Sequence, residues 1–142
     1  MSISTSLRRR YHMDMPERLD RVRRLASASP GLRLLVLYGS RARGTAHARS
    51  DWDLGFLADA GFDVDGLLAG LAEDLGADHV DLADLSRASV VLRHAVAGDG
   101  VVLHERAPGE FHAFQLGAVT DWSDMEMVIR TESDALLARL HS

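Results

Sequence analysis

The chain has 142 residues, of which 46% are hydrophobic and 26% charged, and its net charge is −5, values that are ordinary for one globular domain with its own core. It contains no cysteine, which excludes disulfide scaffolds, thiolate nucleophiles and cysteine-ligated metal sites. No run of about 18 apolar residues is present to cross a membrane, and no apolar segment follows the early arginines as in a secretory signal, so we expect a cytoplasmic protein.

The first third of the chain predicts an arm, a helix and two strands. Residues 1–13 are expected to form a flexible basic arm, and residues 14–142 a single domain. A helix is expected to open at Pro16 and to end at Pro30-Gly31. The unbroken apolar run LRLLVLY over 32–38 predicts a buried strand, and the alternating segment 51–57 predicts a second one. Between them, a short arginine-rich helix or loop runs to residue 49.

The remainder of the chain predicts alternating helices and strands. A helix over 62–75 ends at Gly76, and strands follow at 79–82 and 100–104. Ser86 is a candidate cap for the helix between these strands, which ends at Gly98. From Pro108 onward we expect two helical pieces with a break at 120–123, where Trp122 and the nearby methionines pack in the helix or against a partner. The pattern predicts an α/β (α+β) domain with helices packed on a small sheet.

The charge is unevenly distributed. Residues 1–50 contain 11 arginines and 3 acidic residues, whereas residues 51–142 contain 5 arginines and 18 acidic residues; lysine is absent. The acidic total argues against stable binding of nucleic acid. A basic front half beside carboxylates suits a small polyanion with a metal ion, such as a nucleoside triphosphate.

A predicted strand ends in Gly39-Ser40 and leads into a predicted helix, which is part of the arrangement that binds phosphate groups. The glycine allows close approach to the backbone, and the N-terminus of a helix offers free N–H groups. Ser40 can cap the helix or give its hydroxyl to a phosphate. Arg41 and Arg43 can either bind the triphosphate or remain exposed to solvent.

Three aspartates extend this site. Asp51 and Asp53 lie two residues apart on a predicted strand, so their side chains leave the same face. Adjacent carboxylates repel each other unless a cation lies between them, and oxygen ligands suit Mg²⁺ or Mn²⁺. Asp81, in the otherwise apolar HVDL strand, is a third candidate ligand. Three carboxylates can hold two metal ions, an arrangement that supports nucleotidyl transfer.

These residues resemble the signature of the DNA polymerase β nucleotidyltransferase superfamily: Gly-Ser, ten residues, then Asp-x-Asp. The string LYGSRARGTAHARSDWDL is similar to its minimal nucleotidyltransferase (MNT) branch, whose members act as antitoxins of HEPN-domain toxins. The later segments HVDLADL and GVVLHE, followed by a long helical region, are also similar to that branch.

The resemblance implies a small mixed, mostly antiparallel four-stranded sheet and a role for each matching residue. Gly39 and Ser40 would contact the triphosphate of ATP, and Asp51, Asp53 and Asp81 would be the catalytic, metal-binding carboxylates that hold two Mg²⁺ ions. It implies transfer of AMP to a tyrosine hydroxyl of a HEPN ribonuclease toxin, which neutralises the toxin.

Two residues depart from the family pattern, and two other functions stay open. Trp52 stands where an aliphatic residue is more common, and Gly55 indicates a bulge or a close approach of another chain. One alternative is a nucleotidyltransferase for a small molecule of the aminoglycoside type. The other is a binding module that neutralises a toxin by contact alone.

Overall fold

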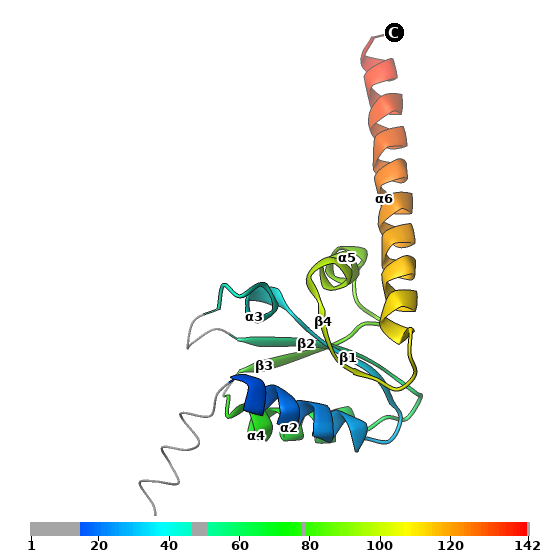
Figure 1. Ribbon diagram of the computed structural model, residues 1–142. Helices are drawn as coiled ribbons and strands as arrows, with labels where there is room; N and C mark the ends of the chain where they lie inside the picture. The colour runs from blue at the N-terminus through cyan, green and yellow to red at the C-terminus, as the bar shows by residue number, and fades with distance from the viewer. Residues whose placement is uncertain (1–14, 47–50, 78, 142) are drawn as a thin grey trace, which may run out of the picture.

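The computed structural model describes residues 15–46, 51–77 and 79–141 (Figure 1). The expected arm over 1–13 lies outside the described residues. In chain order the elements are α2 (Met15–Ser27), β1 (Leu32–Tyr38), α3 (Gly39–Arg43), β2 (Trp52–Ala58), α4 (Val64–Leu75), β3 (Val80–Asp84), α5 (Val90–Asp99), β4 (Val101–Glu105) and α6 (Glu110–Leu140). None of the helices in these ranges has the length and apolar character needed to cross a bilayer.

The four strands form one sheet in the order β3-β2-β1-β4. β1 runs antiparallel to both β2 and β4, whereas β2 and β3 run parallel. The expected sheet, mixed and mostly antiparallel, is therefore confirmed. β1 is central and covered on both faces, which explains why its sequence is apolar without alternation.

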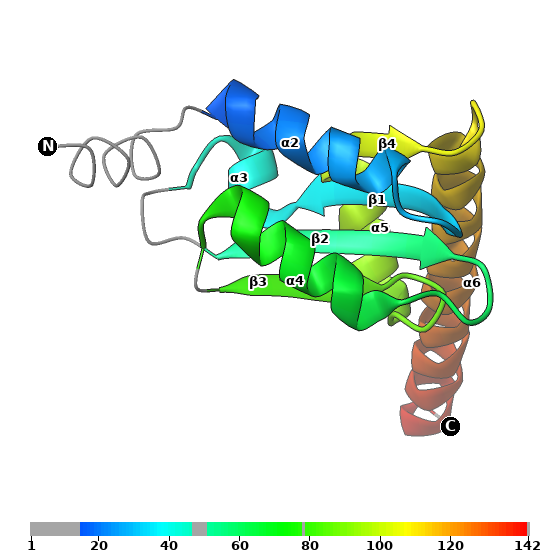
Figure 2. The ribbon, with the colours of Figure 1, turned by 90° about the horizontal axis from the view of Figure 1, so that it is seen from below.

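Helices cover the two faces of the sheet in separate layers (Figures 1 and 2). α2 and α4 pack on one face, where Leu35 and Leu37 of β1 join their core. α5 and the first part of α6 pack on the other face, over Leu34 and Val36. Alternate residues of β1 thus serve two cores, as the two-residue period of a strand requires.

Two expectations about the helices were wrong. The side chain of Ser89, not Ser86, caps α5 by accepting a hydrogen bond of 3.1 Å from the N–H of Leu92. Ser86 instead belongs to a turn, where its hydroxyl donates to Asp84 Oδ1 at 2.6 Å. The region from Pro108 holds one helix of 31 residues rather than two pieces. The hydroxyl of Thr120 donates to the carbonyl of Leu116 at 2.9 Å, so it is satisfied within the helix.

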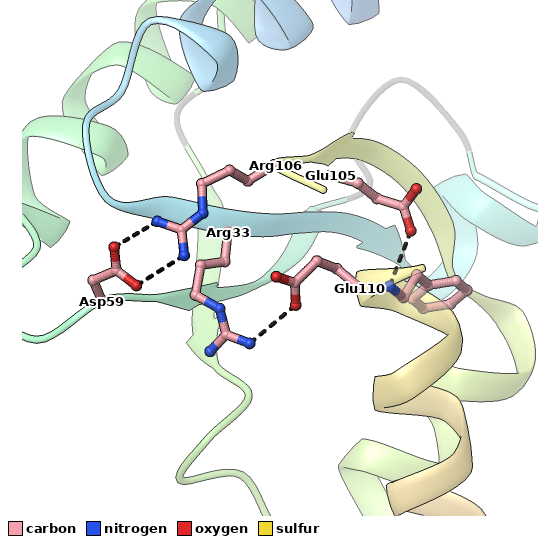
Figure 3. Close-up of polar contacts among 6 residues, drawn as sticks. Arg33, Asp59, Glu105, Arg106 and Glu110 are labelled. Carbon is pink, nitrogen blue, oxygen red and sulfur yellow. Dashed lines mark hydrogen bonds and ion pairs between the residues drawn. The ribbon is translucent and has the colours of Figure 1, made fainter. Parts of the chain in front are cut away.

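A polar cluster fixes the base of α6 to the sheet (Figure 3). Arg33 of β1 donates to Glu110 Oε2 at 3.0 Å, and Glu105 Oε1 of β4 accepts from the N–H of Phe111 at 2.9 Å. Beside them, Arg106 donates to both carboxylate oxygens of Asp59, and this contact lowers the pKa of Asp59. The first turn of α6 is thereby tied to two strands.

Candidate active site

Strand register places three polar side chains in a row across the sheet. Tyr38 of β1 pairs with Asp53 of β2, and Asp53 pairs with Asp81 of β3. Residues directly opposite each other share a face. Tyr38 packs against the core under α5 and α6, so the row lies on that face of the sheet. This row of Tyr38, Asp53 and Asp81, called the carboxylate row below, lies where β1 ends and where β2 and β3 begin.

The carboxylates near this row influence one another. Partial burial raises the pKa of Asp53, and the neighbouring charges of Asp81 and Asp51 raise it further, while Arg43 opposes them. Asp51 lies one residue before β2 and is exposed, as is Asp81. Across the described ranges, no three His, Cys, Asp or Glu side chains are grouped tightly enough to hold a metal ion as they stand. The carboxylates form an acidic neighbourhood whose repulsion a divalent cation would relieve.

Gly39, the first residue of α3, fits closely against Asp53. Its φ angle is 72°, in the left-handed region that favours glycine. A Cβ atom at this position would lie 2.4 Å from Asp53 Oδ2. Both the backbone turn and the approach of the carboxylate therefore require glycine.

Ser40 is the second residue of α3, so it does not cap the helix. Tyr38 occupies the N-cap position and makes no side-chain capping bond. The carbonyl of Ser40 accepts the N–H of Thr45 at 3.0 Å, which closes the end of this short helix. Of the two uses expected for the Ser40 hydroxyl, contact with a phosphate is the one that remains.

The two arginines of α3 have different surroundings. The guanidinium of Arg41 lies 4.0 Å from the centre of the Trp52 ring, and Trp52 belongs to the core under α2 and α4. Burial and the nearby Arg18 lower the pKa of Arg41, which Asp51 partly opposes. Arg43 forms an ion pair of 3.7 Å with Asp99 of α5 and also acts on Asp53. Arg43 is therefore close to Asp53, whereas Arg41 stacks on the opposite core and lies close to Asp51.

Two features of the site were not anticipated from the sequence. Tyr38 lies beside the carboxylates, and burial together with the charges of Asp53 and Asp81 raises its pKa, so its phenol is neutral. The signal was its place as the last strand residue before Gly39. Gly55 indicates neither a bulge nor another chain: a Cβ there would lie 2.7 Å from the side chain of Leu85, which covers it.

Comparisons with known proteins identify the family of the chain. Residues 21–108 match the family model for polymerase beta nucleotidyltransferases, a range that includes the whole carboxylate row. The protein adenylyltransferase MntA of Aphanizomenon flos-aquae is 33% identical over 122 residues, which covers 77% of this chain and 81% of the relative.

Solved structures of toxin–antitoxin complexes have the same fold. A chain of a toxin–antitoxin crystal structure with AMP-PNP is 28% identical, with a TM-score of 0.68 and coverage of 84% of this chain and 98% of that chain. A chain from the complex of tri-AMPylated Shewanella oneidensis HEPN toxin with MNT antitoxin is 25% identical, with a TM-score of 0.63 and coverage of 84% and 96%.

Proposed function

The chain belongs to the polymerase β nucleotidyltransferase family, and from this premise we propose that it is an adenylyltransferase antitoxin. In this proposal it transfers AMP from ATP to a tyrosine hydroxyl of a cognate HEPN ribonuclease toxin and thereby silences it. The observation that carries the proposal is the carboxylate row beside Gly39, where a nucleotide-binding turn and acidic residues meet. The relatives support the same assignment, since they are an adenylyltransferase and antitoxins with an ATP analogue or an AMPylated toxin.

The turn at Gly39 is the proposed site for the triphosphate. Gly39 lets the turn lie against the Asp53 carboxylate, and the Ser40 hydroxyl beside it can donate a hydrogen bond to a phosphate oxygen. Arg43 stands on the carboxylate side and can neutralise phosphate charge. Arg41 is the weaker candidate, because its guanidinium stacks on Trp52.

Asp51, Asp53 and Asp81 are the proposed ligands of two Mg²⁺ ions, for which Mn²⁺ could substitute. Their oxygen atoms are the donors that these ions prefer. Burial raises the pKa of Asp53 most, and the charges of Asp81 and Asp51 raise it further; a bound cation would relieve that repulsion. When bound, such ions would neutralise charge on the reacting phosphate and on the leaving pyrophosphate.

The transfer itself exchanges a phosphoanhydride bond of ATP for a phosphoester bond to the tyrosine oxygen. The tyrosine oxygen of the toxin attacks the α-phosphorus of ATP, and the bond from that phosphorus to the oxygen bridging the β-phosphate breaks, releasing pyrophosphate. A tyrosine hydroxyl has an ordinary pKa of about 10 and must lose its proton to become a strong nucleophile. Asp81, on a different strand from the other two carboxylates, is the group proposed to accept that proton.

Asp81→Asn tests this function against the two alternatives. We expect the variant to keep most of its affinity for ATP and for the toxin, and to lose AMP transfer by about 10²–10⁴-fold, the usual contribution of a general base. The measurement is the mass of the toxin after incubation with ATP and Mg²⁺, together with toxin activity in cells.

Each alternative predicts a different result. If Asp81→Asn still silences the toxin in cells at normal expression, contact alone is sufficient and the enzymatic proposal is wrong. If the unchanged chain modifies an aminoglycoside-type small molecule but not the toxin, the acceptor assignment is wrong.

A further inference from the structure

α6 is divided into a packed part and a projecting part. In the packed part, Phe114 and Ala118 are buried, Trp122 stacks on His94 of α5 at 4.1 Å, and Asp121 pairs with Arg93 at 2.6 Å. Beyond this point the helix leaves the body of the molecule (Figures 1 and 2). Every residue from 126 to 140 is exposed.

The packing face of α6 continues into its projecting part. After Phe114, Ala118 and Trp122, spacings of three or four residues continue along the same face of the helix. We define the distal stripe as the residues at these positions: Met125, Ile129, Glu132, Leu136 and Leu140. Ile129 is 55% exposed, Leu136 57% and Leu140 71%. The stripe has the pattern of a buried helix face. Met125 is half-buried, but from residue 126 onward nothing in the described chain covers it.

A projecting helix with this pattern needs a partner. An isolated helix as short as the projecting part, residues 126–140, is marginally stable in water. Most helical stability comes from packing of an apolar face. On the basis of the proposed function, we propose that the distal stripe is the docking surface for the HEPN toxin, which receives it in an apolar groove with a basic rim.

Charge argues for such a partner and against a second copy of this chain. Residues 124–140 carry four acidic side chains and two arginines. Glu132 lies in the middle of the stripe, so a symmetric pair of these helices would place acidic surfaces together and bury carboxylates in an apolar seam. A ribonuclease binds a polyanion and therefore presents positive surface, which complements the acidic helix.

The position of α6 also suits an acceptor protein. The packed part of α6 and the carboxylate row lie on the same face of the sheet. A protein seated on the distal stripe is thus on the side from which Asp53 and Asp81 are reached. α3, which carries the proposed nucleotide-binding turn, lies at the other end of the sheet from α6 (Figure 1).

Adjacent leucines provide a matched test. Leu136 lies on the stripe, while Leu137, of similar exposure at 52%, lies outside it. We expect Leu136→Asp to weaken binding of the full chain to its cognate HEPN toxin by more than about tenfold, and Leu137→Asp to change it less than about threefold. Binding is measured by titration calorimetry without ATP or Mg²⁺, and circular dichroism checks that both variants keep their helix content. Equal loss in both variants, or no loss in Leu136→Asp, overturns the proposal.

Two further measurements separate the remaining outcomes. Light scattering should find the free chain monomeric; a dimer that Leu136→Asp dissociates would assign the stripe to a second copy and overturn the proposal. Transfer of AMP by the unchanged chain is measured separately by mass spectrometry. Absence of transfer despite normal binding would contradict the proposed function alone, whereas transfer with undiminished binding in Leu136→Asp would contradict the docking surface alone.

Discussion

At the scale of single residues, the charge of Asp53 that the proposed transfer needs also destabilises the folded chain. Its pKa is raised by burial and by Asp81 and Asp51, so its charged form costs free energy in the folded chain at neutral pH. We expect Asp53→Asn to lower AMP transfer by at least about 10²-fold. In metal-free buffer at pH 7 the same variant should melt at a higher temperature than the unchanged chain.

The pH dependence of this difference follows from the direction of the shift. Protonation relieves the repulsion as pH falls through the raised pKa of the folded chain, so the advantage of Asp53→Asn should vanish near pH 4, the ordinary carboxyl pKa. Thermal unfolding between pH 4 and 8 measures it. A variant that is less stable than the unchanged chain at pH 7 would contradict the assigned repulsion.

Gly39 can be tested against a matched glycine. Gly39 and Gly44 both have positive φ angles, 72° and 75°, but only at Gly39 would a Cβ meet the Asp53 carboxylate; nothing lies within 4 Å at Gly44. Alanine at either position should cost about 1 kcal/mol of backbone strain. Only Gly39→Ala should also abolish transfer, because it displaces Asp53. Thermal unfolding and the transfer rate measure the two effects, and equal activity of both variants would refute the close-approach argument.

The two arginines of α3 should fail in different ways. Arg41→Met removes a cation–π contact with Trp52 and should cost about 1 kcal/mol of stability, with little change in ATP affinity once the variant is folded. Arg43→Met removes a positive charge beside Asp53 and should weaken ATP binding by about tenfold, with little effect on melting temperature. ATP titrations and thermal unfolding of both variants measure this contrast. The reverse pattern would place the phosphates on the Trp52 side.

That Gly39, Asp53 and Asp81 lie close together could be predicted from residue type, spacing and resemblance, whereas their surroundings could not. Their roles stay predictions. Tyr38 was missed because its place in the row depends on pairing with β2, a contact between distant segments. The different sides taken by Arg41 and Arg43 depend on packing across two layers, which no local pattern contains.

At the scale of elements, apolar patterns predicted the strands and the first helices to within a few residues. The errors arose where polar side chains choose between local hydrogen bonds. Ser86 and Ser89 both precede α5, and only the fold decides that the first satisfies a turn and the second the helix. The sequence predicts a break at 120–123, yet the helix is continuous there. Asp121 pairs with Arg93 of α5, and the indole N–H of Trp122 donates to Glu126 one turn further along α6.

The cap of α5 provides a prediction at this scale. Ser89→Ala leaves the N–H of Leu92 without its side-chain acceptor and should lower the free energy of unfolding by about 1 kcal/mol. Ser89→Asp retains an acceptor and should restore most of that stability. Chemical denaturation of both variants measures the difference. Equal stability of Ser89→Ala and the unchanged chain would show that the cap contributes nothing.

At the scale of the whole molecule, the chemistry and the proposed docking surface occupy different places. The carboxylate row lies at one end of the sheet, and the distal stripe lies on a helix that leaves the body near the other end (Figure 1). The sequence predicted that Trp122 and its neighbouring methionines belong to a helix or an interface. It could not predict which part of α6 would be packed, because burial depends on the length of the sheet and of α5 beneath it.

α6 is held at its base by the polar cluster, so a small tilt there moves its tip a long way. α6 has 31 residues, a length of about 46 Å, so a tilt of roughly 10° at its base carries its tip about 8 Å sideways. The contacts of Arg33 with Glu110 and of Glu105 with the Phe111 N–H restrain that pivot (Figure 3). These two contacts share that restraint with the packed part of the helix, where Asp121 pairs with Arg93 and Trp122 stacks on His94. The direction of the arm is therefore set by contacts spread along α6 as far as residue 122, and a load on the tip acts on all of them.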